Sequence, residues 1–174
     1  MPTNSKTSRV SASPLPANAL LARYVERGAF TDCFKTTVDR EIQFPSYVVA
    51  FYTTPLFRVE RFILKWLVKR PSSDEDVRRL GAGETTEFAA WTVEARTENQ
   101  MLLCDMHGRT RSWLMSVPDT GQTGHTVLYF GSAVVPRRTT KTGAPKMGAG
   151  FAALKGFHLW YSKALLAGAR SRLE

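Results

Sequence analysis

Hydrophobic positions recur along this chain with two different spacings, and the changes of spacing mark its predicted elements. From Phe30 to Gln43 apolar and polar residues alternate and β-branched residues are frequent, as in a half-buried strand. The alternation returns between Glu87 and Pro136, where we predict four strands, over residues 88–97, 100–106, 109–117 and 125–135. Because short turns join these neighbours, we expect an antiparallel sheet with hairpin connections.

Helical spacing fills the interval between the first strand and the next. Pro45 suits the first turn of one helix, and Thr54 followed by Pro55 predicts the start of a second helix over residues 56–68. We expect the second helix to bury an apolar stripe formed by Leu56, Val59, Phe62, Ile63 and Trp66. Its basic residues are expected on or beside the solvated face: Arg58, Arg61, Lys65 and Lys69.

Two shorter helices are predicted from the signals at their ends. Residues 17–27 place apolar side chains at helical spacing, and Gly28 ends that pattern. Ser73 precedes three acidic residues, an arrangement that suits the N-terminus of a helix, and Gly81 is expected just past the end of this helix.

The closing segment, from Gly150 to Glu174, predicts a long helix with a wide apolar face. Its stripe is formed by Phe151, Leu154, His158, Tyr161 and Leu165, with Phe157, Trp160 and Ala164 beside it. Only the sheet can cover so wide a face, so we predict an α+β fold in which an antiparallel sheet wraps around a long C-terminal helix. Gly156 and Gly168 weaken a helix, which indicates that the helix passes close to another element at these positions.

Length and composition indicate one globular domain. The chain has 174 residues, of which 43% are hydrophobic and 22% charged, values close to globular averages. We expect residues 1–16, rich in serine and free of acidic residues, to form a disordered tail, and residues 17–174 to form the domain. The Thr-, Lys- and Gly-rich segment from Arg137 to Gly150 is expected to be a mobile loop.

The sequence favours a soluble cytoplasmic protein. No apolar run approaches the length that a membrane span needs, and the first sixteen residues lack the apolar core of a secretory signal. The two cysteines, Cys33 and Cys104, could form one disulfide at most, and reduced thiols are the simpler interpretation.

The chain is basic, with a net charge of +9 from 24 Lys and Arg against 15 Asp and Glu. This charge would attract nucleic acid or anionic membrane, and such a contact could use four basic residues of the late loop, Arg137, Arg138, Lys141 and Lys146. Because the basic residues are scattered rather than in a long run, a solvated basic surface is the alternative.

A strand, two or three helices, an antiparallel set of strands and one long C-terminal helix is an order that resembles the START-like, Bet v 1-like helix-grip superfamily (polyketide cyclase-like, SRPBCC). The resemblance covers residues from about Phe30 to Arg172, and the segment FYTTPLFRVERFILKWLV is similar to uncharacterised bacterial members. It implies a cavity between sheet and helix, in which members bind lipids, polyketides or hormones and some act as cyclases. It implies no catalytic motif.

Motifs for covalent or metal chemistry are weak. Cys104 and His107 could pair as nucleophile and base, but residues three apart on a strand point to opposite faces, which favours a buried cysteine beside a turn histidine. His107, His125 and His158 lack the spacing of metal ligands. We therefore expect no metal site and no cofactor.

A ligand site under the C-terminal helix is the better hypothesis. In a hairpin turning at His107-Gly108, Leu102 would pair with Trp113 and Cys104 with Arg111. The candidate ligand-binding residues are Glu94, Arg111, Trp113, Met115, His158 and Tyr161.

Each of these candidates has a structural alternative. If the shared face of Arg111, Trp113 and Met115 is concave, Arg111 could bind a carboxylate or phosphate; otherwise Arg111 is solvated or paired with Glu94. His158 could equally make a structural hydrogen bond. Arg58, Glu60 and Arg61 could gate a pocket or dock a partner, or simply form the solvated side of a helix.

Three functions follow from these hypotheses. The first is binding of a small apolar or amphipathic ligand between the sheet and the C-terminal helix. The second is a cyclase- or hydratase-type enzyme that uses Arg111, Glu94 or His158 in the same cavity. The third is a basic module that contacts nucleic acid or anionic membrane. The sequence gives no indication of the oligomeric state.

Overall fold

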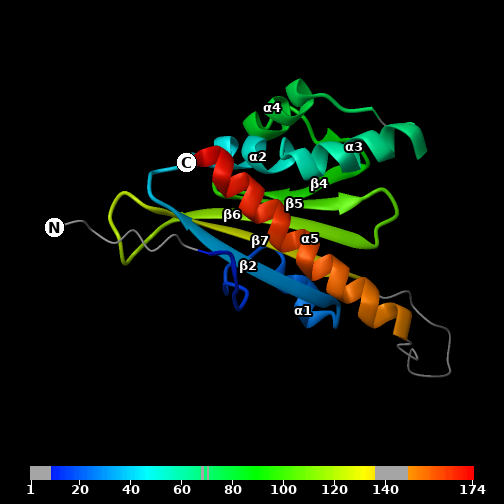
Figure 1. Ribbon diagram of the computed structural model, residues 1–174, viewed down its shortest axis with the longest axis horizontal. Coiled ribbons are helices and arrows are strands. Elements are labelled where there is room, and N and C mark those ends of the chain that lie inside the picture. Colours follow the sequence, from blue (N-terminus) through cyan, green and yellow to red (C-terminus); the bar gives the residue numbers. More distant parts are fainter. Residues whose placement is uncertain (1–8, 68, 70, 136–148) are drawn as a thin grey trace.

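The alternating segments join into one antiparallel sheet in a computed structural model, which describes residues 9–67, 69, 71–135 and 149–174 and, of residues 64–67 and 149–155, only the backbone (Figure 1). Within these residues the sheet has seven strands in the order β1-β2-β7-β6-β5-β4-β3. They are β1 (Ser11–Ala12), β2 (Phe30–Val38), β3 (Glu87–Phe88), β4 (Trp91–Arg96), β5 (Gln100–Asp105), β6 (Thr110–Pro118) and β7 (Thr126–Val134). The predicted α+β fold with an antiparallel sheet is confirmed.

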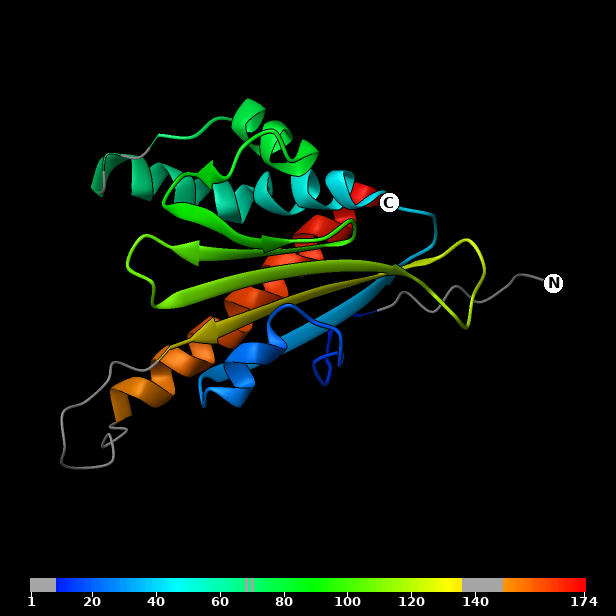
Figure 2. The ribbon, with the colours of Figure 1, turned by 180° about the vertical axis from the view of Figure 1, so that it is seen from behind.

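Helices cover both faces of this sheet. The long helix α5 (Ala149–Leu173) crosses one face diagonally, and α2 (Phe44–Tyr52), α3 (Pro55–Leu67) and α4 (Asp74–Ala82) lie beside it (Figure 1). The short helix α1 (Ala22–Glu26) lies on the opposite face, against β2 (Figure 2). None of the described helices combines the length and the apolarity that a bilayer span requires.

Side-chain caps start α3 and α4 where the sequence predicts. Before Pro55, the hydroxyl of Thr54 accepts a hydrogen bond from the Phe57 amide at 3.3 Å. Ser73 and Asp76 form a capping box, in which the Ser73 hydroxyl accepts from the Asp76 amide at 3.1 Å and the Asp76 carboxylate accepts from the Ser73 amide at 2.7 Å.

The end of α4 lies two residues later than predicted. Gly81 is buried inside the helix, and a Cβ there would lie 3.0 Å from the carbonyl oxygen of Pro45, so this glycine lets α2 and α4 approach closely. The left-handed residue that ends the helix is Gly83, with φ of +81°.

The strands differ from the prediction in two places. Residues 88–97 form two strands instead of one, because β3 turns into β4 at Ala89, whose φ is +51°. Strand β2 stops at Val38 rather than near residue 43. Val38 pairs with Thr126, which is the first residue of β7. Within the expected N-terminal tail, residues 11–12 pair with β2 as β1.

The register of the hairpin between β5 and β6 is confirmed. Leu102 lies opposite Trp113 and Cys104 opposite Arg111, and Gly108 takes the left-handed conformation at the turn, with φ of +68°.

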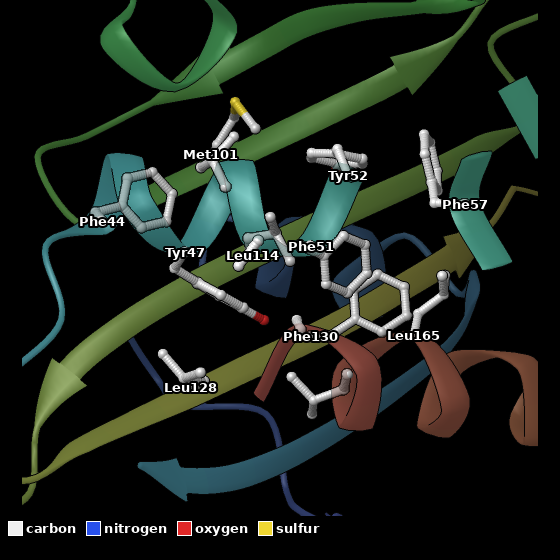
Figure 3. Close-up of a cluster of buried hydrophobic side chains, with 14 of the residues drawn as sticks. Phe44, Tyr47, Phe51, Tyr52, Phe57, Met101, Leu114, Leu128, Phe130 and Leu165 are labelled. Carbon is white, nitrogen blue, oxygen red and sulfur yellow. The ribbon is translucent and has the colours of Figure 1, made fainter. Parts of the chain in front are cut away.

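Apolar side chains fill two cores, one on each face of the sheet. The larger lies under α2 and α5, where the ring of Phe51 packs 5.1 Å from Tyr52 and 4.7 Å from Phe130, between ring centroids (Figure 3). The smaller lies on the α1 side and includes Leu21, Tyr24, Cys33, Leu102, Trp113 and Met115. Two cores explain why β5 is apolar on both of its faces.

The predicted apolar stripe of α3 is wrong in its orientation. Val59, Phe62 and Ile63 are exposed, and Leu56 is half-buried. The helix instead buries Phe57, whose ring packs 4.9 Å from that of Tyr52, and Arg61. The Trp66 side chain lies outside the described residues.

Arg61 explains this orientation, because its guanidinium ties α3 to the start of α4. It donates to the Ser72 carbonyl oxygen at 2.7 Å and to the Asp74 carboxylate at 2.7 Å. A long side chain with five donors can be buried when each donor finds an acceptor.

The apolar face of α5 is buried mainly in its C-terminal half. Leu165, Leu166 and Ala169 pack in the larger core, whereas Phe157 and Trp160 are exposed. The side chains of Phe151 and Leu154, and most of the loop expected over residues 137–150, lie outside the described residues.

Of Gly156 and Gly168 in α5, only Gly168 passes close to another element. A Cβ at Gly168 would lie 3.1 Å from Cγ2 of Thr54, whereas a Cβ at Gly156 would meet nothing within 4 Å. Thr54 cannot rotate away without losing its cap, since its hydroxyl donates to the Phe51 carbonyl oxygen and accepts from the Phe57 amide.

We therefore expect opposite effects from the same substitution at two positions of one helix. Gly168→Ala should lower the free energy of unfolding by about 1 kcal/mol through overpacking, and Gly156→Ala should raise it by about 0.5 to 1 kcal/mol through helix propensity. Urea unfolding followed by circular dichroism measures both. A stabilising Gly168→Ala would contradict the close packing of α5 on Thr54.

Candidate functional site

A cavity of about 190 Å³ lies between the sheet, α3 and α5. Its apolar wall includes Phe51, Phe57, Trp91, Phe130 and Leu165, and its polar side chains include Glu60, Ser132, His158, Tyr161 and Ser162. Three larger hollows, of about 480, 460 and 360 Å³, are surface grooves with many exposed lining residues. The cavity under α5 is therefore where buried polar groups and an apolar wall meet.

A buried carboxylate, Asp32, anchors one side of this cavity. It lies on β2 directly across from Ser132 of β7, and it is only 8% exposed. Its Oδ1 accepts hydrogen bonds from the Ser132 amide at 2.9 Å and from the Ser132 hydroxyl at 2.6 Å. The Ser162 hydroxyl of α5 donates to its Oδ2 at 3.5 Å. A carboxylate this deeply buried needs such donors to remain in the core.

His158 brings an imidazole from α5 to the same carboxylate. Its Nε2 lies 2.7 Å from the Ser132 hydroxyl oxygen and 3.4 Å from Asp32 Oδ2. In a hydrolytic triad the carboxylate orients the imidazole through one ring nitrogen while the other contacts the serine. Here Nε2 of His158 faces both Ser132 and Asp32, and Asp32 accepts a hydrogen bond from Ser132 directly. The three side chains therefore form a hydrogen-bonded cluster rather than a nucleophile triad.

A second titratable pair joins α3 to α5. The hydroxyl of Tyr161 donates a hydrogen bond to the carboxyl group of Glu60. Burial raises the pKa of Glu60, against the opposing effect of the Tyr161 hydrogen bond, and burial together with the neighbouring Glu60 raises the pKa of Tyr161. At this end of the cavity the Glu60 carboxyl group and the Tyr161 hydroxyl group therefore both tend to keep their protons.

These groups give the cavity two chemically different parts. His158 offers an imidazole that is backed by the Asp32 carboxylate, which does not itself line the cavity, and Glu60 offers a carboxyl group with an increased tendency to hold its proton. Aromatic rings from α2, α3 and the sheet separate these groups from the rest of the core. The arrangement can orient a small molecule that has both a polar and an apolar part, and it can donate and accept protons.

The structure brings together only part of the predicted site. His158 and Tyr161 line the cavity, and the structural hydrogen bond considered for His158 is present, to Ser132. Trp113 and Met115 pack in the core on the α1 side, so the face they share with Arg111 is the one turned away from α5. The neighbouring residue Ser112 faces the cavity side instead.

Arg111 is paired with Glu94, which was the alternative prediction. Its Nε lies 2.5 Å from Glu94 Oε2 and 2.8 Å from the Tyr24 hydroxyl oxygen, and Tyr24 donates to Glu94 at 2.5 Å. This pairing lowers the pKa of Glu94 against the effect of its burial. Arg111 borders the cavity, but its guanidinium is already engaged by Glu94 and Tyr24, and Glu94 is not among the lining residues.

Sequence reasoning missed Asp32, Ser132 and Ser162. Asp32 could have been found, because it shares the inward-facing parity of Phe34, Thr36 and Val38 on β2, and a carboxylate in such a row is unusual. Arg58, Glu60 and Arg61 were noted only as a charge cluster. Glu60 and Arg61 are turned inward, which contradicts the view of this cluster as a solvated helix face.

The other candidate chemistry does not assemble. Burial raises the pKa of the Cys33 thiol to about 12, and Cys104 is half-buried; both are free thiols. His107 is exposed in its turn. Within the described part of the chain no three His, Cys, Asp or Glu side chains are grouped to hold a metal ion. The four basic residues of the late loop, Arg137, Arg138, Lys141 and Lys146, lie outside the described residues.

No family model matches the chain, and no curated protein and no solved structure is similar to it at a significant level. The seven-stranded antiparallel sheet with its C-terminal helix is compatible with a helix-grip architecture.

Removing the buried carboxylate should destabilise the fold. We expect Asp32→Ala to lower the free energy of unfolding by about 3 kcal/mol, because it leaves the Ser132 amide and the hydroxyl groups around it without their acceptor. The matched variant is Asp39→Ala, whose side chain is 57% exposed beside His125, and it should change stability by at most about 0.5 kcal/mol. Equal losses in urea unfolding would contradict an anchoring role for Asp32.

Glu60 should make stability depend on pH. Because its pKa is raised above the ordinary value of 4.5, the folded protein holds a proton that the unfolded chain has lost. This contribution is complete below the ordinary pKa and disappears as the pH rises through the raised one. We expect Glu60→Gln to flatten that fall in urea midpoints measured from acidic to neutral pH. Glu84→Gln, at a 63% exposed glutamate, should leave the profile unchanged.

Proposed function

We propose that this protein binds a small amphipathic molecule in the cavity between its sheet and α5, as a member of the START-like, helix-grip type. The observation that carries the proposal is the coincidence, in one cavity, of aromatic walls with two polar clusters that share α5, one reaching the sheet through Ser132 and the other reaching α3 through Glu60. The place of the cavity under the C-terminal helix supports the same proposal, since the helix-grip resemblance implies a ligand there.

The size of the cavity restricts the ligand. The volume of about 190 Å³ lies below the range of about 300 to 1,000 Å³ that is usual for ligand pockets. One aromatic ring with a short substituent, or a short acyl chain, matches this space, whereas a sterol or a whole lipid exceeds it. The ligand we propose is therefore smaller than those implied by the family resemblance.

The chemistry of the walls suggests how such a ligand is oriented. Its apolar part would lie against Phe51 and Phe130, and its polar end would reach His158 on one side or the Glu60–Tyr161 pair on the other. A hydroxyl or carbonyl group suits both positions, because the ring nitrogens of histidine and the protonated groups of the pair can exchange hydrogen bonds with it.

A second candidate function is acid–base catalysis of the hydratase or cyclase type. It is favoured by one observation, that Glu60 and the imidazole of His158 line the same cavity. Such reactions need one group that gives a proton and one that accepts it. Glu60→Gln keeps the shape of the side chain, so conversion of a bound molecule that stops in this variant while binding continues would identify catalysis.

Filling the cavity should abolish binding. Indole and hexanoate are suitable probes, and isothermal titration calorimetry with the whole protein measures their affinity. We expect Leu165→Phe to weaken both by at least about tenfold, since the added ring occupies the ligand's space. Leu173→Phe, the same exchange on the same helix at a residue that does not line the cavity, should bind like the unchanged protein.

Native mass spectrometry of the purified protein provides an independent test, because a co-purified molecule would appear as added mass. Absence of added mass together with no affinity for either probe would overturn the binding proposal. So would equal affinity in the Leu165→Phe and unchanged proteins.

A further inference from the structure

Five exposed apolar side chains stand on the two helices that border the cavity. This apolar patch consists of Val59 (56% exposed), Phe62 (63%) and Ile63 (47%) on α3, and of Phe157 (61%) and Trp160 (58%) on α5. Among the described residues, the other exposed large apolar side chains are Val25, Met106 and Val134, each on a different element. Exposed apolar side chains gathered on adjoining helices indicate a binding surface.

The two halves of the patch adjoin through the Glu60–Tyr161 hydrogen bond. On α5, the ring of Phe157 stacks on that of Tyr161 at 6.0 Å between centroids and lies 5.9 Å from that of Trp160. On α3, Val59 and Ile63 precede and follow Glu60 by one and three residues, within one helical turn. Both helices approach the same end of the molecule in the two views (Figures 1 and 2).

Basic side chains are exposed next to the patch. Arg58 and Lys69 flank its α3 side, and Lys163 follows Trp160 on α5. Nearby acidic groups are already engaged, Glu60 by Tyr161 and Asp74 by Arg58. Together with the net charge of +9, this arrangement favours an anionic partner.

The combination of apolar and basic groups identifies the kind of partner. A second copy of this chain would bring two strongly basic surfaces together, so self-association is disfavoured. Nucleic acid would satisfy the cations and its bases can stack on exposed rings, but it has no apolar layer for the aliphatic side chains of Val59 and Ile63. A lipid surface offers both, because aromatic side chains prefer the interfacial layer of a bilayer and basic ones its anionic headgroups.

We propose that the apolar patch docks onto an anionic lipid bilayer. Phe62, Phe157 and Trp160 enter the interfacial layer, and Lys69 and Lys163 lie against the headgroups, whereas Arg58 stays paired with Asp74. Docking in this orientation places the contact between α3 and α5, which Glu60 and Tyr161 form, at the membrane surface. The inference is independent of the ligand proposed for the cavity.

Vesicle co-sedimentation of the whole protein tests this proposal. The probes are vesicles of phosphatidylcholine alone and vesicles of equal parts phosphatidylcholine and phosphatidylglycerol. We expect binding to the anionic vesicles only, and weaker binding as sodium chloride is raised. The double variant Phe62→Ser with Trp160→Ser should reduce the bound fraction at least about tenfold, because the interfacial aromatic contacts are lost.

A control variant changes two other exposed apolar residues, Val25 (49% exposed) and Met106 (46%). Val25→Ser with Met106→Ser should bind anionic vesicles like the unchanged protein, and circular dichroism confirms that both double variants are folded. No binding to anionic vesicles, equal binding to neutral ones, or full binding by the Phe62 and Trp160 variant would overturn the proposal. So would a dimer in sedimentation velocity that these two substitutions dissociate, since the patch would then face a second copy.

Discussion

The long antiparallel pairing of β2 with β7 is the constraint on which the rest of the structure depends. These strands are separated by about ninety residues of chain, and every residue of β2 from Phe30 to Val38 has a partner in β7. The pairing requires Gly131, because a Cβ at that position would lie 2.8 Å from the Asp32 carbonyl oxygen and 3.0 Å from the Trp113 ring. It places Asp32 opposite Ser132, beneath α5.

The polar cluster that results is difficult to explain by stability alone. A buried carboxylate with its hydrogen-bonded partners is often no more stabilising than apolar residues of the same volume. Asp32, His158 and the Glu60–Tyr161 pair nevertheless all lie beside one cavity. Titratable groups held in such surroundings are typical of functional sites, and this concentration is what connects the fold with a binding or catalytic role.

Helix α5 serves both sides of this arrangement. Its C-terminal half closes the larger core with Leu165, Leu166 and Ala169, and its middle contributes His158, Tyr161 and Ser162 to the cavity. Towards its N-terminal end the helix exposes Phe157 and Trp160, so the apolar face changes from core to surface along the same helix. The larger core, the cavity and the outer surface therefore all depend on one element.

Local patterns in the sequence determined the elements and much of their pairing. Alternation placed the main strands, Thr54 and Ser73 marked helix starts, and the turn at His107-Gly108 gave the register of Leu102 with Trp113, because each depends on neighbouring residues only. The tertiary structure decided which faces are covered. The hydrogen bonds of Arg61 orient α3 so that its apolar stripe faces outward. Trp113 and Met115 pack in the second core, on the α1 side of the sheet and away from α5. The site followed from contacts between residues about a hundred positions apart, such as Asp32 with Ser132, which no local spacing specifies.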